Sequence, residues 1–352
     1  MPPTDMEGLM QGQGMPAATQ SGDPPFPRPD EAGAVVVIGA GLVGLPAGLV
    51  FALAGYTVRM VEVDERRRAS VPERVASLLR FMVDHGLVDQ AAAAAAEPRI
   101  GVSSSPEAAA AAHDGRAPAL VLEAVFENLK LKQRTLAEAE RHVGPDVIMC
   151  SVTSGLSITA IAADLRHPQR FCGAHFWNPP HLIPLVEVIY GERTADQTAE
   201  AVFALMEFVG KVPVYVRKDV PGFIGNRLLH ALQKEAMAVV ASGVASAADV
   251  DLVVTEGFGR RCAVLGPLTV CDLAGLDLIL DIDSYLIRDL DRSPEPSPLL
   301  VQLVSEGKIG VKSLQGFRTW TEEEVRQTIA RRDAALIRAL QIDRQEEAAV
   351  DA

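Results

Sequence analysis

Hydrophobic and polar positions divide the first part of the chain into alternating strands and helices. The unbroken apolar run Ala34–Ile38 is typical of a central parallel strand that is buried on both faces. Gly39–Ala54 follows with a helical pattern, and Thr57–Val63 predicts a second strand. Residues 64–98 predict helix, because they combine an amphipathic pattern with a run of alanines, which have the highest helix propensity.

Further short apolar runs continue this alternation. They predict strands at Ala119–Val125, Val147–Ser151, Arg170–Gly173 and Leu185–Ile189. Helical patterns lie between them, at Leu129–Val143 and Ser157–Leu165. Alternating strands and helices favour an α/β fold with a Rossmann-like, doubly wound sheet.

The pattern changes after Val216. The segment 219–223 marks a break, and beyond Ile224 the pattern is almost wholly helical. At 352 residues the chain exceeds one ordinary domain. We therefore expect an α/β domain followed by an all-α domain. The expected boundaries are a disordered tail at 1–31, the α/β domain at 32–218, the helical domain at 219–325 and a charged helix or tail at 326–352.

Composition excludes several functional classes. A formal charge of −13 argues against a nucleic-acid partner, because phosphate binding needs a basic face. No apolar run is long enough to span a bilayer, and residues 1–31 lack the pattern of a signal or transit peptide. The four cysteines have no metal-binding or redox spacing and sit in apolar contexts, which predicts buried, reduced thiols and a cytoplasmic location. They are Cys150, Cys172, Cys262 and Cys271.

A glycine-rich segment between the first strand and the next helix predicts dinucleotide binding. It reads Gly39-Ala40-Gly41-Leu42-Val43-Gly44. In such a motif the first glycine permits the turn, the second lets the pyrophosphate approach, and the third lets helix and strand pack closely. Glu62 ends the second strand, where an acid would accept the adenosine ribose hydroxyls, with Asp64 as the alternative. A carboxylate there repels a 2′-phosphate and favours NAD, whereas the basic cluster Arg66–Arg68 would favour NADP.

A histidine, a serine and two further polar residues form the candidate chemistry. His175 precedes a rigid Asn-Pro-Pro turn, and Glu187 follows twelve residues later in an apolar run. A histidine held by a buried carboxylate can act as a general base near neutral pH. Ser154 lies just beyond a predicted strand, at the edge where such sheets bind ligands, and Asn226 opens the helical part. The alternatives are a structural core histidine at 175 and an ion pair of Glu187 with Arg193.

Several stretches of the chain resemble the 3-hydroxyacyl-CoA dehydrogenase family, in its short-chain branch and its relatives L-gulonate 3-dehydrogenase and lambda-crystallin. The resemblance covers residues 34–320. It is carried by Glu123–Lys132, Thr153-Ser154, Gly173–Pro180, Pro221–Leu228, Gly266-Pro267 with Asp272–Asp277, and Gly307–Phe317. It implies an NAD-dependent oxidoreductase of fatty acid metabolism that forms a homodimer, chiefly through residues 220–300.

The family's residue roles transfer to matching positions. The resemblance implies that Ser154 and Asn226 hold the substrate oxygen and that His175, oriented by Glu187, takes the hydroxyl proton. It further implies that four residues neighbour the cofactor: Glu127, Lys132, Asn178 and Lys312. Asn178, preceding Pro179, could equally fix a turn.

Three departures from the family pattern bear on specificity. Val152 stands where the family has asparagine, and Leu314-Gln315 interrupt a lysine- and glycine-containing segment. Trp177 replaces a more common phenylalanine. None of these changes removes a catalytic group, so they bear on which acyl substrate is accepted.

The leading hypothesis is oxidation of a 3-hydroxyacyl thioester, or its reversal, on coenzyme A or an acyl carrier protein, with Arg66–Arg68, Arg74 or Arg80 holding the carrier. A free hydroxy acid of gulonate or carnitine type is the alternative, with Arg260 or Arg261 pairing its carboxylate. A nucleotide-sugar dehydrogenase would need a nucleophilic cysteine in a glycine-rich loop, a setting that Cys262 lacks. A crystallin-like protein or a silent dinucleotide sensor would not need the intact chemical residues.

Overall fold

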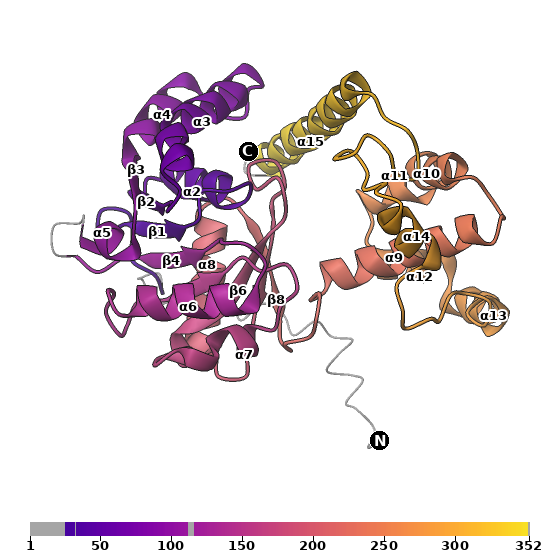
Figure 1. The fold of residues 1–352 in the computed structure, drawn as a ribbon, viewed down its shortest axis with the longest axis horizontal. Coiled ribbons are helices and arrows are strands. Elements are labelled where there is room, and N and C mark those ends of the chain that lie inside the picture. The colour runs from indigo at the N-terminus through magenta and orange to yellow at the C-terminus, as the bar shows by residue number, and fades with distance from the viewer. Residues whose placement is uncertain (1–24, 32, 112–115, 351–352) are drawn as a thin grey trace. The chain divides into compact units, whose positions relative to one another are not determined.

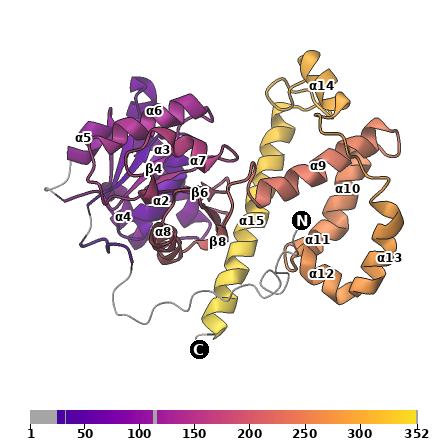
Figure 2. The same cartoon turned by 90° about the horizontal axis from the view of Figure 1, so that it is seen from below.

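The computed structural model describes residues 25–31, 33–111 and 116–350, with side chains up to residue 346. The chain divides into two compact units, Met1–Asp219 and Val220–Ala352 (Figure 1). We call them the first unit and the second unit. The first contains a sheet with helices on both faces, and the second is helical (Figure 2).

The first unit is built on one sheet, which in the described residues has eight strands in the order β3-β2-β1-β4-β5-β6-β7-β8. Neighbouring strands are parallel except β6 and β7, which are antiparallel. The strands are β1 Val35–Ile38, β2 Val58–Val61, β3 Ile100–Ser103, β4 Leu120–Glu123, β5 Met149–Ser151, β6 Phe171–Phe176, β7 Leu185–Ile189 and β8 Val212–Val216. Residues in β1 and β4 are buried throughout, as expected for central strands covered on both faces.

Several helices of this unit begin at side chains that cap them. Asp64, Asn128 and Ser157 each accept a hydrogen bond from a backbone N–H of the first helical turn. The helices are α2 Gly44–Leu53, α3 Glu65–Asp84, α4 Gln90–Ala96, α5 Pro106–Ala111, α6 Leu129–Glu140, α7 Ile158–Ile161 and α8 Asp196–Phe208. Short 3₁₀ turns occur at Glu97–Arg99, Ala162–Asp164 and Pro168–Arg170.

The second unit contains seven described α-helices: α9 Gly225–Ala241, α10 Ala247–Glu256, α11 Phe258–Cys262, α12 Pro267–Ala274, α13 Leu276–Leu286, α14 Pro298–Ser305 and α15 Glu322–Val350. No residue of α9 to α14 is fully buried in the described structure. Large apolar side chains on these helices are therefore exposed. No helix in the described part of the chain is long and apolar enough to cross a membrane.

The expected α/β fold with a helical C-terminal region is confirmed. The sequence pattern did not predict β3 and β8, because these short strands are less apolar than β1. It ended the strand before His175 at Gly173, whereas β6 continues to Phe176 because it pairs with β7. It began the first helix at Gly39, whereas α2 begins at Gly44 after the glycine turn.

Two further expectations concern the tail and the thiols. The expected disordered tail lies largely outside the described residues, but Phe26 is buried and its ring lies 5.5 Å from that of Phe208. Cys150 and Cys172 are buried on adjacent strands, and burial raises the pKa of Cys150 well above its ordinary value. The expectation of a buried thiol is wrong for Cys262, which is exposed at the end of α11.

Candidate active site

The glycine turn after β1 has the geometry of a dinucleotide site. Gly39 has φ +104°, and a Cβ there would lie 2.5 Å from the carbonyl oxygen of Ala124. A Cβ on Gly44 would lie 1.9 Å from the carbonyl oxygen of Gly39, so helix and turn pack too closely for a side chain. A Cβ on Gly41 would meet no atom of the described chain within 4 Å. The open space at the second glycine is where a pyrophosphate must approach, so these residues fit NAD.

Two arginines of α3 bind the backbone around this turn. Arg74 donates to the carbonyl oxygens of Ala40 at 2.8 Å and Gly41 at 3.3 Å. Arg68 donates to those of Glu62 at 2.9 Å and Val63 at 3.2 Å. These guanidinium groups hold the loops around the glycine turn in place. The sequence offered Arg68 as one candidate for a carrier or a 2′-phosphate, and Arg74 as one candidate for a carrier.

The acid at the end of β2 is distinguished from its alternative. Glu62 is buried, and its Oε1 accepts from the backbone N–H of Asp64 at 3.0 Å. Asp64 caps α3 instead, because its Oδ1 accepts from the backbone N–H of Arg67 at 2.8 Å. Glu62 thus remains the candidate for the ribose hydroxyls.

Three large apolar side chains stand exposed just beyond the carboxyl ends of adjacent strands. Leu42, Val63 and Phe126 follow β1, β2 and β4 and are 82%, 79% and 70% exposed. The Arg67 guanidinium lies 5.7 Å from the centroid of the Phe126 ring. Flat apolar walls at this edge suit an adenine base. The sequence pattern did not identify Val63 or Phe126 as site residues. It placed Val63 at the end of a predicted strand, whereas the position of Phe126 directly after the predicted strand Ala119–Val125 could have indicated it.

A buried polar network supports the loop that carries Ser154. Oε1 of Glu127 accepts from Oγ1 of Thr153 at 2.6 Å and from the backbone N–H of Ser154 at 2.9 Å. Nζ of Lys132 lies 3.3 Å from the other oxygen of Glu127 and 3.0 Å from Oε1 of Glu123. Burial would raise the pKa of Glu127, but hydrogen bonds from Thr153 and Ser154 and the charge of Lys132 outweigh it and lower that pKa.

Lys132 and Glu123 form the fully buried part of this network. Lys132 and Glu123 are 1% and 0% exposed, and Ser151 donates to Glu123 at 2.5 Å. The buried Lys132 thus contacts Glu127, whose side chain is half-exposed. Glu123, Ser151 and Thr153 were missed from sequence, since nothing marked them as partners of a buried lysine.

The pairing of β6 with β7 brings His175 and Glu187 together. They are direct partners in the antiparallel register, so their side chains share one face of the sheet. Nδ1 of His175 lies 2.7 Å from Oε2 of Glu187, and the two residues are 5% and 1% exposed. Trp177 donates from Nε1 to the same oxygen at 3.2 Å. The alternative pairing of Glu187 with Arg193 is wrong, because Arg193 donates to the carbonyl oxygen of Ala162.

This pair has the chemistry of a general base. A carboxylate only accepts, so Nδ1 of His175 carries the proton in the bond to Glu187, and Nε2 is the basic nitrogen. Strands β5 and β6 are parallel neighbours with Ser151 opposite Gly173. Ser154 and His175 consequently lie at the same carboxyl edge of the sheet, where doubly wound folds bind ligands.

The remaining candidates are distributed over both units. Asn178 is exposed at the start of the turn and joined to Pro179 by a cis peptide bond. Asn226 is the second residue of α9, and Lys312 is exposed in the loop before α15, so both belong to the second unit. Arg260 forms an ion pair with Glu256 at 2.5 Å, one helical turn away.

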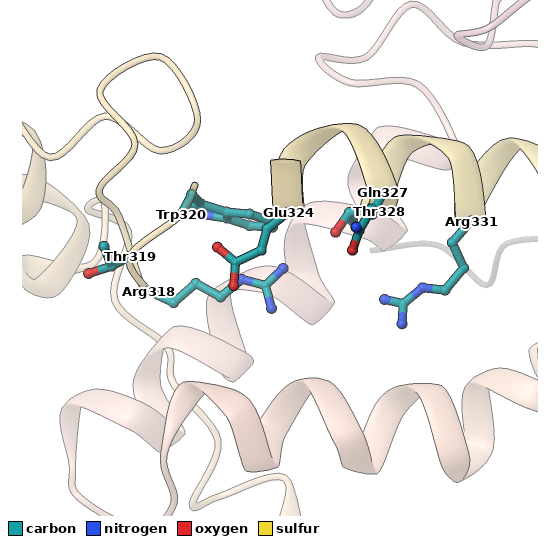
Figure 3. A pocket seen from close by; sticks show the side chains of 7 residues that line it. All are labelled: Arg318, Thr319, Trp320, Glu324, Gln327, Thr328 and Arg331. Atoms are coloured by element: carbon teal, nitrogen blue, oxygen red, sulfur yellow. The ribbon is translucent and has the colours of Figure 1, made fainter. Parts of the chain in front are cut away.

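The second unit also has a cavity of about 280 Å³ at the start of α15 (Figure 3). The guanidinium of Arg318 lies 3.6 Å from the centroid of the Trp320 ring in its wall. No residue assigned to cofactor or chemistry lines this cavity, whose lining is Arg318, Thr319, Trp320, Glu324, Gln327, Thr328 and Arg331.

Comparisons with known proteins place both units in one family. The model of the 3-hydroxyacyl-CoA dehydrogenase NAD-binding domain matches residues 34–220, and that of the C-terminal domain matches residues 222–320. A probable 3-hydroxybutyryl-CoA dehydrogenase of Bacillus subtilis is 36% identical over 290 residues, which are 82% of this chain and 98% of the relative.

A second kind of relative acts on a pyridine compound. The 5-formyl-3-hydroxy-2-methylpyridine 4-carboxylate 5-dehydrogenase of Mesorhizobium japonicum is 40% identical over 218 residues, 62% of this chain and 71% of the relative. A crystal structure of an enzyme of this name, described as an NAD⁺-dependent dismutase, superposes with a TM-score of 0.80 at 33% identity. The superposition covers 88% of this chain and 97% of that one.

Proposed function

Because this chain belongs to the 3-hydroxyacyl-CoA dehydrogenase family of NAD-dependent oxidoreductases, we propose that it interconverts a 3-hydroxyacyl thioester and its 3-oxoacyl form. The observation that carries the proposal is the buried His175–Glu187 pair at 2.7 Å, at the carboxyl edge of the sheet. A carbon gives up a hydride only if its hydroxyl loses a proton, and this pair supplies the acceptor.

Each residue has a defined part in the proposed reaction. The first unit would hold NAD at the glycine turn, and the cofactor would supply the acceptor for the hydride of the hydroxyl-bearing carbon. Nε2 of His175 takes the hydroxyl proton, while Glu187 keeps the imidazole in one tautomer and stabilises its charged form. Ser154, at the carboxyl edge of the sheet, would hold the substrate oxygen. In the reverse direction the protonated His175 returns the proton to that oxygen.

The domain assignment follows from these roles. Residues 32–218 would bind NAD, with Asn178 and Glu127 near the nicotinamide side. Residues 219–325 would form the helical substrate and dimerisation domain. Buried free thiols at Cys150 and Cys172 support a reducing, cytoplasmic compartment, and the thioester substrate supports a part in fatty acid metabolism.

The test is NADH formation from NAD and (S)-3-hydroxyacyl-CoA substrates of increasing chain length. We expect turnover with the native chain and a fall in kcat of about 10³-fold in His175→Ala, since the general base is lost. The control is His142→Ala, because His142 pairs with the half-exposed Glu138 and not with a residue of the proposed site. Absence of turnover at every chain length, or an unchanged kcat in His175→Ala, would overturn the proposal.

The carrier would bind along α3. Arg66 and Arg80 are exposed on this helix, whereas Arg68 and Arg74 bind backbone carbonyls. An exposed guanidinium can pair with the phosphates of coenzyme A or of an acyl carrier protein. Arg80→Ala should then raise KM for the thioester about tenfold and leave kcat unchanged. An unchanged KM would remove Arg80 from the carrier site.

A free carboxylate substrate is the second candidate, favoured by the 40% identity to a dehydrogenase of a formyl-pyridine carboxylate. The hydrate of an aldehyde carries a hydroxyl on the carbon that loses hydride, so the same base would serve. A substrate panel separates the two candidates. It compares thioesters, free 3-hydroxy acids and aromatic aldehyde carboxylates at equal concentration, and turnover confined to the free acids would exclude the carrier-bound substrate.

The exposed apolar helix faces of the second unit support a homodimer. Leu268, Leu273 and Leu280 are among the large apolar side chains exposed on α12 and α13. Exposed faces of this extent mark interfaces in soluble proteins, and two-fold pairing of identical faces is the commonest arrangement. Sedimentation velocity should show a dimer for the native chain and a monomer for Leu280→Asp. A native monomer would contradict the proposed dimer.

A further inference from the structure

The indole of Trp177 shares the carboxylate that binds the proposed base. Its Nε1–H donates to Oε2 of Glu187 at 3.2 Å, and Nδ1 of His175 lies 2.7 Å from the same oxygen. Strand geometry accounts for this, because residues two apart point to the same face and His175 is the register partner of Glu187.

We propose that Trp177 is a positioning residue that tunes the base. Its N–H holds Glu187 as a carboxylate and limits how strongly Glu187 stabilises the protonated form of His175. The inference rests on the proposed function, in which His175 moves the proton. Trp177 thereby acts through Glu187 and not by contact with the reacting atoms.

Burial and donor chemistry give the indole this role. Glu187 is 1% exposed, so protein donors must satisfy its oxygens. An indole N–H can only donate, and it is a neutral group that does not titrate. Its bond to Oε2 stabilises the ionised carboxylate and opposes protonation of that oxygen. Glu187 remains an acceptor for Nδ1–H of His175 throughout the reaction.

The sign of the effect follows from two donors sharing one oxygen. A carboxylate that also binds Trp177 has less of its charge available to the imidazolium form of His175. Removing the indole N–H leaves more of that charge to His175 and favours the protonated imidazole. Oxidation needs the unprotonated base, so activity in that direction should then begin at higher pH.

The charged groups identified just before β8 and beyond β5 are engaged elsewhere. Strand β8 places Val214 beside Glu187, and Lys211, just before β8, donates to the carbonyl oxygens of Pro180 and Ile183. Beyond β5, Glu127 is bound by Thr153 and Lys132, as described above. Of the neighbours identified in the first unit, Trp177 is thus the donor that bears directly on the His175–Glu187 pair.

An NMR titration without substrate tests the electrostatic effect. The ring resonance of His175, assigned by its loss in His175→Ala, is followed against pH in the native chain and in Trp177→Phe. We expect the midpoint to rise by about half a pH unit in Trp177→Phe, which keeps an aromatic ring but no donor. Trp320→Phe is the matched control, because Trp320 belongs to the second unit. An unchanged or lowered midpoint overturns the proposal.

A second measurement leaves Trp177 in place, so it holds even if Trp177→Phe folds poorly. The chain has two tryptophans, so Trp320→Phe leaves one indole N–H resonance. A bond to a buried carboxylate predicts a downfield position that moves upfield in Glu187→Gln. A resonance typical of exposed indole, insensitive to Glu187→Gln, contradicts the bond itself.

The kinetic consequence is measured in the oxidation direction. The acid limb of kcat/KM against pH should move up by the same half unit in Trp177→Phe, while the high-pH plateau changes less than about twofold. If the NMR midpoint of His175 shifts in Trp177→Phe but the acid limb of kcat/KM does not, Trp177 affects the His175–Glu187 pair without affecting the reaction. That result overturns its role in catalysis. Failure of the proposed function has a different signature, namely retained turnover in His175→Ala.

Discussion

The two units bury their large apolar side chains to very different extents. In the first unit, β1 and β4 are buried along their whole length, and the buried charges of Lys132 and Glu123 pair with each other. In the second unit no described residue of α9 to α14 is fully buried, and Leu268 is 80% exposed. The first unit is therefore stabilised by its own core, whereas the second presents apolar faces that need a further surface to cover them.

The largest expected effect on stability comes from breaking the buried ion pair of Lys132 and Glu123 in the core of the first unit. Lys132→Met should lower the free energy of unfolding by about 4 kcal/mol, because Glu123 would keep a buried charge without its cation. Urea unfolding measures the change. Lys130→Met, an exposed change on the same helix, should have little effect. A loss below 1 kcal/mol in Lys132→Met would show that Glu123 takes up a proton at little cost.

The proposed base of the first unit depends on the pairing of β6 with β7, which places Glu187 opposite His175. Glu187→Gln should lower kcat about 10²-fold, because the amide orients His175 but cannot stabilise its charged form. Steady-state NADH formation measures this, with the fold checked by circular dichroism. Glu192→Gln changes an exposed carboxyl close in sequence and should leave kcat unchanged. Equal rates for the two variants would remove Glu187 from the mechanism.

How far sequence predicts this molecule differs between local and long-range features. The glycine turn and the buried strand β1 were predictable, because each depends on residues adjacent in the chain. The contact of His175 with Glu187 was expected from a family resemblance, yet its cause is the antiparallel register of β6 and β7, which no local pattern specifies. Likewise, nothing near Lys132 in sequence indicates that Glu123 binds it.

Lys211 is a partly buried lysine of the first unit, and the described structure shows no acidic partner for it. Burial lowers its pKa from 10.5 to about 8, and its Nζ donates to two backbone carbonyls. Between these values the unfolded chain binds the proton more tightly, so the free energy of unfolding should rise with pH from about 8 to 10.5. We expect a rise of about 1–2 kcal/mol that Lys211→Met abolishes.

Urea unfolding at pH 7.5, 8.5 and 9.5 would measure this dependence against Lys218→Met, an exposed lysine close in the chain. Burial also raises the pKa of Cys150, and it raises that of Tyr56 to about 12. Both groups lower the free energy of unfolding as the pH rises above their ordinary values, so the effect of Lys211 is the difference in slope between the native chain and Lys211→Met. The same slope in Lys211→Met and the native chain would assign the pH dependence to other groups.

The smallest expected effect contrasts the cysteines of the two units. Cys262 is exposed and should react rapidly with a thiol reagent, whereas Cys150 and Cys172 are buried and should react only on unfolding. Modification of Cys262 should change the free energy of unfolding by less than about 0.5 kcal/mol, because no buried contact is lost. Cys262→Ser should remove the fast phase. A fast phase that persists in this variant would mean that the core of the first unit opens readily, and the contrast between the units would then reflect dynamics more than burial.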